Sequence, residues 1–346
     1  MTDITVTSPV LAPTAASAGS RGASLAGLLV RKVASAVLVL WLAATVTFFA
    51  LRLVPGDPVL AILGNPSSAP PAGVLAATRQ EYGLQHPLLV QYVDYLGRLA
   101  RGDLGQSYSL KQDVTTVIGD QVASTVVLTL AALATAWVIA ALGTLLTVRR
   151  GRVVRSLGTG LEVLTAALPQ FWLGILLLVV FGFHLGLVPV AGGTGVRSLV
   201  LPTLTLAVPL AGFLGQVTRQ SFDEAMAQPF VLSARMRGMG DWAVRSRHVL
   251  RHALLPGLTL SGWAVGSLFS GAVVVETLFA RPGLGKTLLD AVTRRDMPVV
   301  LGGVLLIAVV YVVVNLVVDA LYLVVDPRLR RPSRGTGNRR SSGVRA

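Results

Sequence analysis

The chain has 346 residues, of which 53% are hydrophobic and only 13% are charged, whereas a soluble globular domain carries about 25% charged residues. This composition argues against a soluble enzyme, a disordered protein and a nucleic-acid-binding domain, although the net charge of +14 requires that the basic residues be located. The absence of cysteine excludes a disulfide scaffold, a Cys-ligated metal site and a thiol nucleophile.

The N-terminal segment 1–26 is rich in Ala, Ser and Thr, and this composition predicts a disordered tail. A first apolar run follows and predicts a membrane span at about 33–53. The run continues into Arg52-Leu53-Val54-Pro55-Gly56-Asp57-Pro58 and not into a small-residue cleavage site. We therefore expect a retained span and not a cleaved signal peptide.

A long polar segment, residues 54–118, separates this span from the next apolar run. Proline and glycine predict two short helices within it: one from Pro71 to Tyr82, stopped by Gly83, and one from about Pro87 to Ala100. The second helix has an apolar face at helical spacing, formed by Leu88, Tyr92, Tyr95, Leu96 and Leu99. That face suits either the membrane surface or a partner, or packing against the rest of this chain.

Five further apolar runs follow along the chain. A bilayer core of ~30 Å needs about 20 apolar residues per helix, and each run is long enough. They predict spans at about 121–148, 162–185, 198–218, 253–275 and 297–320. Six such runs in one chain disfavour buried helices of a large soluble protein. The sequence thus predicts an all-α integral membrane protein with six transmembrane helices.

Residues 219–252 form the longest connection after the external segment. The stretch Phe230-Val231-Leu232-Ser233-Ala234-Arg235-Met236-Arg237-Gly238 predicts a short helix ended by glycine. Asp241 is then expected as the N-cap of an amphipathic basic helix that runs to Pro256. Its polar side is expected to carry Asp241, Arg245, His248 and His252, and its apolar side Trp242, Val249 and Ala253. This shape suits insertion into a groove of a partner, or a basic hairpin at the membrane interface.

Two motifs in the second half of the chain do not predict the chemistry that they resemble. Gly283-Leu284-Gly285-Lys286-Thr287 resembles the end of a phosphate-binding loop, but Ala280 stands where the first glycine is needed and no strand precedes it. His248 and His252 have a metal-ligand spacing, yet arginines flank them and would repel a cation. The ionisable groups His184, Glu276 and Asp319 all lie near span ends, and Asn315 is a further polar residue. Together they predict no proton relay.

The basic residues set the orientation. With six spans and the N-terminus inside, the inner segments hold 20 of the 30 Lys and Arg residues. The positive-inside rule therefore predicts that both termini are cytoplasmic, with residues 54–118 outside. The positive charge then faces the cytoplasm and anionic lipid headgroups, which removes the main support for a nucleic-acid partner. The Arg- and Ser-rich segment 331–346 is expected to be a second disordered tail.

Several short motifs together resemble the membrane-spanning permease subunit of a bacterial ABC importer, and more narrowly the first permease of the dipeptide, oligopeptide and nickel group. The resemblance covers about residues 27–330. The matching stretches are 51–58, 82–84, 86–88, 91–92, 102–105, 169–174, 230–238, 276–279, 282–285 and 326–328. The positions that define these motifs are Pro55, Gly56, Asp57, Pro58, Gly102, Asp103, Gly105, Pro282, Gly283, Gly285, Asp326 and Pro327.

This resemblance implies a type I permease fold in a bacterial cytoplasmic membrane. The expected partners are a second, similar permease, two ATP-hydrolysing subunits and an extracytoplasmic binding protein that delivers peptide. The family's coupling motif falls on Leu232, Ser233, Ala234, Arg235 and Gly238, without the acidic residue that begins the motif in other importers. ATP chemistry would belong to the separate subunits, so this chain would be no enzyme and would need no cofactor.

Other interpretations remain open at this point. The same type of permease serves nickel or another small solute, and the sequence does not choose among these substrates. A stand-alone secondary transporter would predict internal repeats and buried ionisable groups. A membrane-embedded enzyme would predict a nucleophile and base, or a metal site, inside a span. Neither pattern is clear in this sequence.

Overall fold

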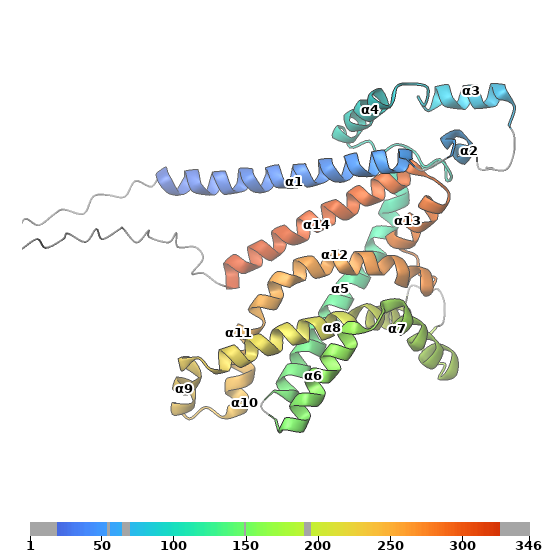
Figure 1. The fold of residues 1–346 in the computed structure, drawn as a ribbon. Coiled ribbons are helices and arrows are strands. Elements are labelled where there is room, and N and C mark those ends of the chain that lie inside the picture. The colour runs from blue at the N-terminus through green and yellow to red at the C-terminus, as the bar shows by residue number, and fades with distance from the viewer. Residues whose placement is uncertain (1–18, 54–55, 64–69, 149, 190–194, 326–346) are drawn as a thin grey trace, which may run out of the picture.

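The computed structural model describes residues 19–53, 56–63, 70–148, 150–189 and 195–325 (Figure 1). These residues are helical apart from their connections and one isolated bridge between Gln106 and Asp113. Most of the two expected tails therefore lies outside the described residues, as do the motif positions Pro55, Asp326 and Pro327. The expected tail 1–26 is in part helical, because the first helix begins at Gly19.

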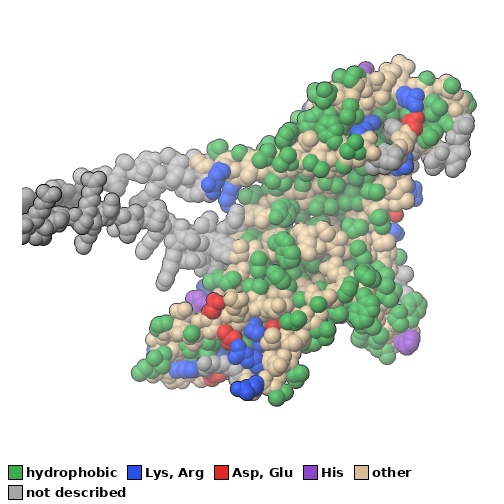
Figure 2. Space-filling model, viewed as in Figure 1, with side chains coloured by type: hydrophobic (Ala, Val, Ile, Leu, Met, Phe, Trp, Pro, Cys, Tyr) green, Lys and Arg blue, Asp and Glu red, His purple; other side chains and the backbone are tan. Residues whose placement is uncertain are grey.

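Among the described residues, five helices are long and apolar enough to cross a membrane. They are α1 (Gly19–Leu53), α5 (Val114–Thr147), α8 (Val196–Met226), α12 (Leu255–Leu278) and α14 (Met297–Val325). Each covers the apolar run that predicted it to within two residues at either end. Apolar side chains cover the middle of the face seen in Figure 2, and basic side chains gather toward the two ends of the molecule.

The third expected span is bent, so the prediction of one continuous helix over 162–185 was wrong. It consists of α6 (Arg152–Ala167) and α7 (Gln170–Leu177), which continues as a π-helix over Leu178–His184, and the two parts meet at 101°. The cause is Pro169. Proline disfavours the α conformation in the residue before it, and Leu168 accordingly has an extended backbone with ψ 128°. The pair counts as a sixth span only if both arms together cross the membrane.

The polar segment after α1 contains α2 (Pro58–Ile62), α3 (Ala72–Glu81) and α4 (Leu88–Ala100). The two helices predicted between Pro71 and Ala100 are thus confirmed, and Gly83 ends the first in a left-handed conformation with φ 62°. The apolar face of α4 packs on this chain: Tyr95 is buried against Phe48 of α1 and Leu305 of α14. Leu88, which was expected on that face, is exposed.

The core of the bundle lies between α5, α8 and α12. Alanines of α5, among them Ala132, Ala136 and Ala140, are buried there, and such small residues let helices approach closely in a membrane. In Figure 1 the start of α1, the end of α14 and the segment after α8 lie toward one end of the bundle. Helices α3 and α4 and the short helix α13 (Leu284–Thr293) lie toward the other end.

Candidate functional site

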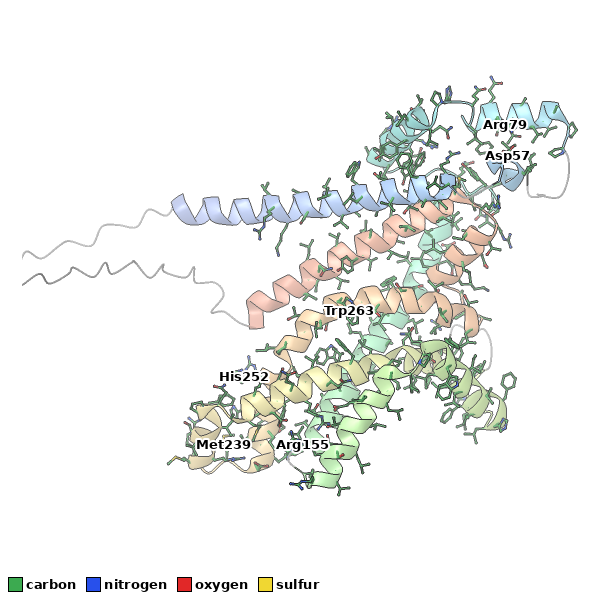
Figure 3. All side chains as sticks on the ribbon, in the orientation of Figure 1. Asp57, Arg79, Arg155, Met239, His252 and Trp263 are labelled. Atoms are coloured by element: carbon green, nitrogen blue, oxygen red, sulfur yellow. The ribbon has the colours of Figure 1, made fainter. Side chains whose placement is uncertain are left out.

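The connection between α8 and α12 folds into α9 (Pro229–Met236), α10 (Asp241–Ala243), a π-helix over Val244–Val249, and α11 (Leu250–Ala253). We call residues 227–254 the α8–α12 loop. Figure 3 places Met239 and His252 of this loop at the end of the molecule opposite Asp57 and Arg79. We predicted one regular α-helix from Asp241 to Pro256. That prediction was wrong, because a π-helix over Val244–Val249 interrupts the α-helix.

Gly238 ends α9 in the way that the sequence predicts. Its φ is +80°, a left-handed conformation that favours glycine. Its N–H donates to the carbonyl of Arg235 at 2.9 Å, and the N–H of Met239 donates to the carbonyl of Ala234 at 3.3 Å. Together these bonds form the Schellman arrangement that satisfies the last carbonyls of a helix. The chain then turns sharply into α10.

Ala234 is buried inside the α8–α12 loop. It is only 2% exposed and packs with Val231, Val244 and Val249 in a core cluster that also includes Phe222 of α8. The resemblance places Ala234 and Gly238 in the coupling motif, and in the free chain Ala234 belongs to the packing of the loop itself. A small residue is needed there because the loop packs on itself and on α8.

The opposite face of the loop exposes large apolar side chains outside the long helices. Leu232 is 64% exposed, Met236 81% and Trp242 55%. Leu232 and Met236 are four residues apart on α9 and so share one face, while Trp242, expected on the buried side of its helix, is exposed on α10. Ser233 and Arg235 are exposed as well, and Arg235 pairs with Asp241 at 2.7 Å.

Arg245 anchors the loop to the end of α5. The side chain is buried, and its Nη2 donates to the main-chain carbonyl of Leu145 at 2.8 Å and to that of Val148. These are orphan carbonyls at the C-terminus of a long helix, where a positive charge is also favoured by the helix dipole. We expected Arg245 on an exposed polar face and Asp241 as an N-cap. Instead Gly240 is the N-cap, and Asp241 pairs with Arg235 and, at 3.7 Å, with Arg245.

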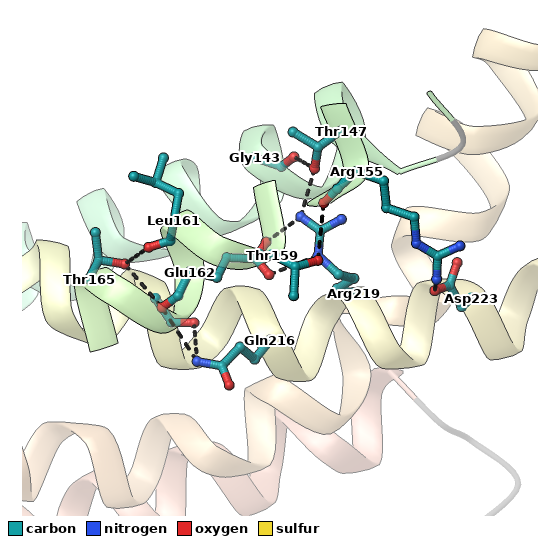
Figure 4. A network of polar contacts seen from close by, with 11 residues as sticks. Gly143, Thr147, Arg155, Thr159, Leu161, Glu162, Thr165, Gln216, Arg219 and Asp223 are labelled. Atoms are coloured by element: carbon teal, nitrogen blue, oxygen red, sulfur yellow. Dashed lines mark hydrogen bonds and ion pairs between the residues drawn. The ribbon is translucent and has the colours of Figure 1, made fainter. Parts of the chain in front are cut away.

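A buried ion pair joins α6 and α8 near the same end of the bundle (Figure 4). Arg219 donates through Nε to Oε2 of Glu162 at 2.8 Å and through Nη2 to Oε1 at 2.6 Å. The same Nη2 lies 2.6 Å from the hydroxyl oxygen of Thr147 at the end of α5. Sequence reasoning missed this network, because both charged residues had been taken as simple boundaries of apolar runs. The three contacts tie α5, α6 and α8 together.

The stretch that resembles a phosphate-binding loop binds a carboxylate of this chain. Glu276 of α12 is fully buried, and it accepts hydrogen bonds from the hydroxyl of Thr125 at 2.5 Å and from the main-chain N–H of Lys286 at 3.1 Å. The N-terminus of α13 thus caps the buried side chain of Glu276. A side chain at Gly283 or Gly285 would collide with Glu276 or with the backbone of Val273, which explains both glycines of this motif.

The motif positions between residues 56 and 105 build turns at the end of the bundle that lies opposite the α8–α12 loop. Gly102 and Gly105 have φ of 77° and 78°, and Asp103 accepts the N–H of Gly105 at 2.8 Å. Asp57 accepts the N–H of Val59 at 2.9 Å and pairs with Arg79 at 2.5 Å. Gly56 also has a positive φ of 130°, and Pro58 begins α2. These residues shape the polar segment and do not converge on one cleft with the α8–α12 loop.

Asp296, between α13 and α14, is a further buried acidic residue that sequence reasoning missed. Its carboxylate accepts hydrogen bonds from the hydroxyls of Ser107 at 2.5 Å and Ser109 at 2.7 Å. It also accepts the main-chain N–H groups of Tyr108 at 3.1 Å and Ser109 at 2.9 Å. The loop before α5 is therefore fixed on the start of α14.

Comparison with known proteins defines the class. Residues 139–331 match the family described as binding-protein-dependent transport system inner membrane component, and residues 25–129 match the N-terminal family of such membrane components. The chain belongs to this family and is an integral membrane protein. Transport systems of this kind pair the membrane component with an ATPase and a substrate-binding protein, and ATP hydrolysis belongs to the separate subunits.

Several curated relatives match nearly the whole chain. A di/tripeptide transport system permease of Pseudomonas aeruginosa is 36% identical over 314 residues, covering 82% of this chain and 93% of the relative. A glutathione transport system permease of Salmonella typhimurium is 35% identical, covering 84% and 94%. A Brucella abortus protein named for a peptide transport system permease is 36% identical, covering 88% and 99%. A solved amino acid ABC transporter shares 18% identity over 62% of this chain and 94% of its own, with a TM-score of 0.43.

Proposed function

We propose that this chain forms part of the translocation pathway of an ATP-driven importer for small peptides. Residues 27–330 would be the permease unit, paired with a second, similar permease and with two ATPase subunits, and an extracytoplasmic binding protein would deliver the peptide. The observation that carries the proposal is the 36% identity to a di/tripeptide permease over 82% of this chain. Nickel or another small solute is the alternative cargo.

The test is uptake by the assembled system. The chain would be co-expressed with a second permease and the ATPase subunits and reconstituted into vesicles with the binding protein outside. We expect ATP-dependent accumulation of labelled di- or tripeptides and none of nickel. Uptake of nickel without peptide uptake would reject the peptide assignment, and uptake that needs no ATP would reject the importer.

We further propose that both termini and the α8–α12 loop are cytoplasmic. The start of α1, the end of α14 and α9 lie toward the same end of the bundle (Figure 1), and arginines of the loop, among them Arg237, Arg247 and Arg251, lie there too. This arrangement supports a single inner side that carries the basic residues.

Cysteine labelling tests this orientation, because the chain has no cysteine of its own. Single cysteines would replace Ala72, Ser156 and Ser233, each of which is exposed. An impermeant thiol reagent applied to intact cells should label only the cysteine at position 72, and all three after the membrane is permeabilised. Labelling of position 156 or 233 in intact cells would show that these positions are outside and that the proposed orientation is wrong.

Within this complex, the α8–α12 loop would contact the ATPase. Exposed Leu232, Met236 and Trp242 have the character of an apolar anchor outside the membrane. Arg245 would carry the movement of the loop to α5, since its side chain binds the last carbonyls of that helix. Gly238 and Ala234 would hold the loop in shape.

A further inference from the structure

A cavity of about 690 Å³ lies beside α4, at the end of the molecule opposite the α8–α12 loop. Its walls come from the last turn of α1, from α4, from the loop that precedes α5 and from the first turn of α14. This volume falls within the range of about 300–1,000 Å³ that is usual for small-molecule sites. The cavity combines apolar, aromatic and charged side chains.

Three arginines line the wall, Arg52, Arg98 and Arg101, and none of them has a carboxylate partner within ion-pair distance among the described residues. Arg52, in the last turn of α1, is half-buried, and its guanidinium lies 5.5 Å from the centre of the Phe48 ring. Arg98 of α4 lines the same cavity. Arg98 is exposed, whereas Arg52 is half-buried. A partly desolvated cation without an anion is costly, so an anionic group of a ligand would compensate Arg52 in the first place, with Arg98 at hand as a second cation.

Two polar atoms of the wall are buried and lack a hydrogen-bond partner. They are the hydroxyl oxygen of Tyr95 and Oε1 of Gln91. Tyr95 is only 8% exposed, and burial raises its pKa to about 12, so the hydroxyl stays protonated and available as a donor. The amide of Gln91 is held by its Nε2, which donates to the carbonyl of His86 at 2.8 Å, and Oε1 is left free as an acceptor.

The far wall of the cavity is fixed before any ligand arrives. Tyr108 lines it, and the neighbouring Ser107 and Ser109 are bound to the buried carboxylate of Asp296. The turn at Asp103 and Gly105 holds the adjoining backbone. A preformed wall lowers the entropy that binding costs.

We propose that this cavity is a binding site for a peptide-like solute with a free carboxylate. The carboxylate would lie between Arg52 and Arg98, the Tyr95 hydroxyl would donate to it, and Gln91 Oε1 would accept an N–H. Four acids also line the cavity, Glu81, Asp94, Asp103 and Asp113, and they would favour an ammonium group and disfavour an anionic lipid headgroup. That the solute is peptide-like rests on the proposed function. That the cavity binds a carboxylate rests only on the residues that line it.

Calorimetry on the purified full chain in nanodiscs of a zwitterionic lipid tests the site, with alanyl-alanine as the probe and its C-terminal amide as the comparison. We expect binding of the acid, and affinity for the amide at least about tenfold weaker, because a charge-assisted pair is lost. Arg52→Gln and Arg98→Gln should each weaken binding about tenfold, and Tyr95→Phe about threefold. Tyr95→Phe removes only a hydroxyl and should fold. It therefore still tests the site if an arginine variant fails to fold.

Arg294→Gln, an exposed change beside the same end of the bundle, is the matched control and should leave the affinity unchanged. Equal binding of the acid and the amide, or unchanged affinity in both arginine variants, would overturn the proposal. Loss of dipeptide binding when phosphatidylglycerol is added to the nanodisc would also overturn it, because the cavity would then be a lipid site. In each of these cases peptide uptake by the whole complex would still support the proposed function.

Discussion

Replacing Glu162 by alanine should lower the free energy of unfolding of the purified chain by about 3–5 kcal/mol, because it leaves a buried guanidinium without its carboxylate. Arg219 is bound at two points by Glu162 and at a third by Thr147. The side chains of both charged residues are about nine-tenths buried. Unfolding of the wild-type and variant chains in detergent, followed by circular dichroism against denaturant, measures the difference.

The structure provides a control of the same chemistry a short distance away. Arg155 and Asp223 also join α6 to α8, at 2.8 Å (Figure 4), but both side chains are substantially exposed. Asp223→Ala should therefore cost only about 0–1 kcal/mol. The double variant Glu162→Leu with Arg219→Met should recover much of the loss, since apolar residues often replace a buried pair without penalty. Equal losses in Glu162→Ala and Asp223→Ala would show that burial does not strengthen the first pair.

The pairs of charged residues also show where sequence reasoning ends. Apolar runs predicted six spans, of which five are long helices, and the Pro and Gly signals predicted α3 and α4, because these features depend on neighbouring residues alone. Glu162 and Arg219 are far apart in sequence, and no local pattern pairs them. Each looked like the polar end of an apolar run until the helices were placed side by side.

The bend at Leu168-Pro169 had a local signal that the length of the apolar run outweighed. Residue 168 precedes a proline, and the α conformation is disfavoured in such residues. The hydropathy of the whole run nevertheless predicts a single span. The burial of Ala234 had no such signal. Periodicity puts Val231 and Ala234 on one face of α9 and Leu232 and Met236 on another, yet only the packed loop decides which face is covered.

The largest functional effect is expected at the exposed face of that loop. Met236→Asp places a charge where we propose that the ATPase makes an apolar contact. Because Met236 is 81% exposed in the free chain, the substitution should leave folding and membrane insertion intact. The complex should lose most of its co-purified ATPase, and ATP-dependent uptake should fall at least about tenfold, as at an apolar hot spot.

Ala234→Asp and Gly238→Val separate this contact from the shape of the loop. Ala234→Asp buries a charge among Val231, Val244 and Val249, at a cost of several kcal/mol, so the loop itself should unfold. Gly238→Val strains a backbone with φ +80° by about 1–3 kcal/mol. Both variants should expose the loop to limited proteolysis, whereas Met236→Asp should stay resistant while losing ATPase. Normal ATPase retention and uptake in Met236→Asp would remove the exposed face of α9 from the coupling contact and would leave Ala234 and Gly238 with a purely structural role.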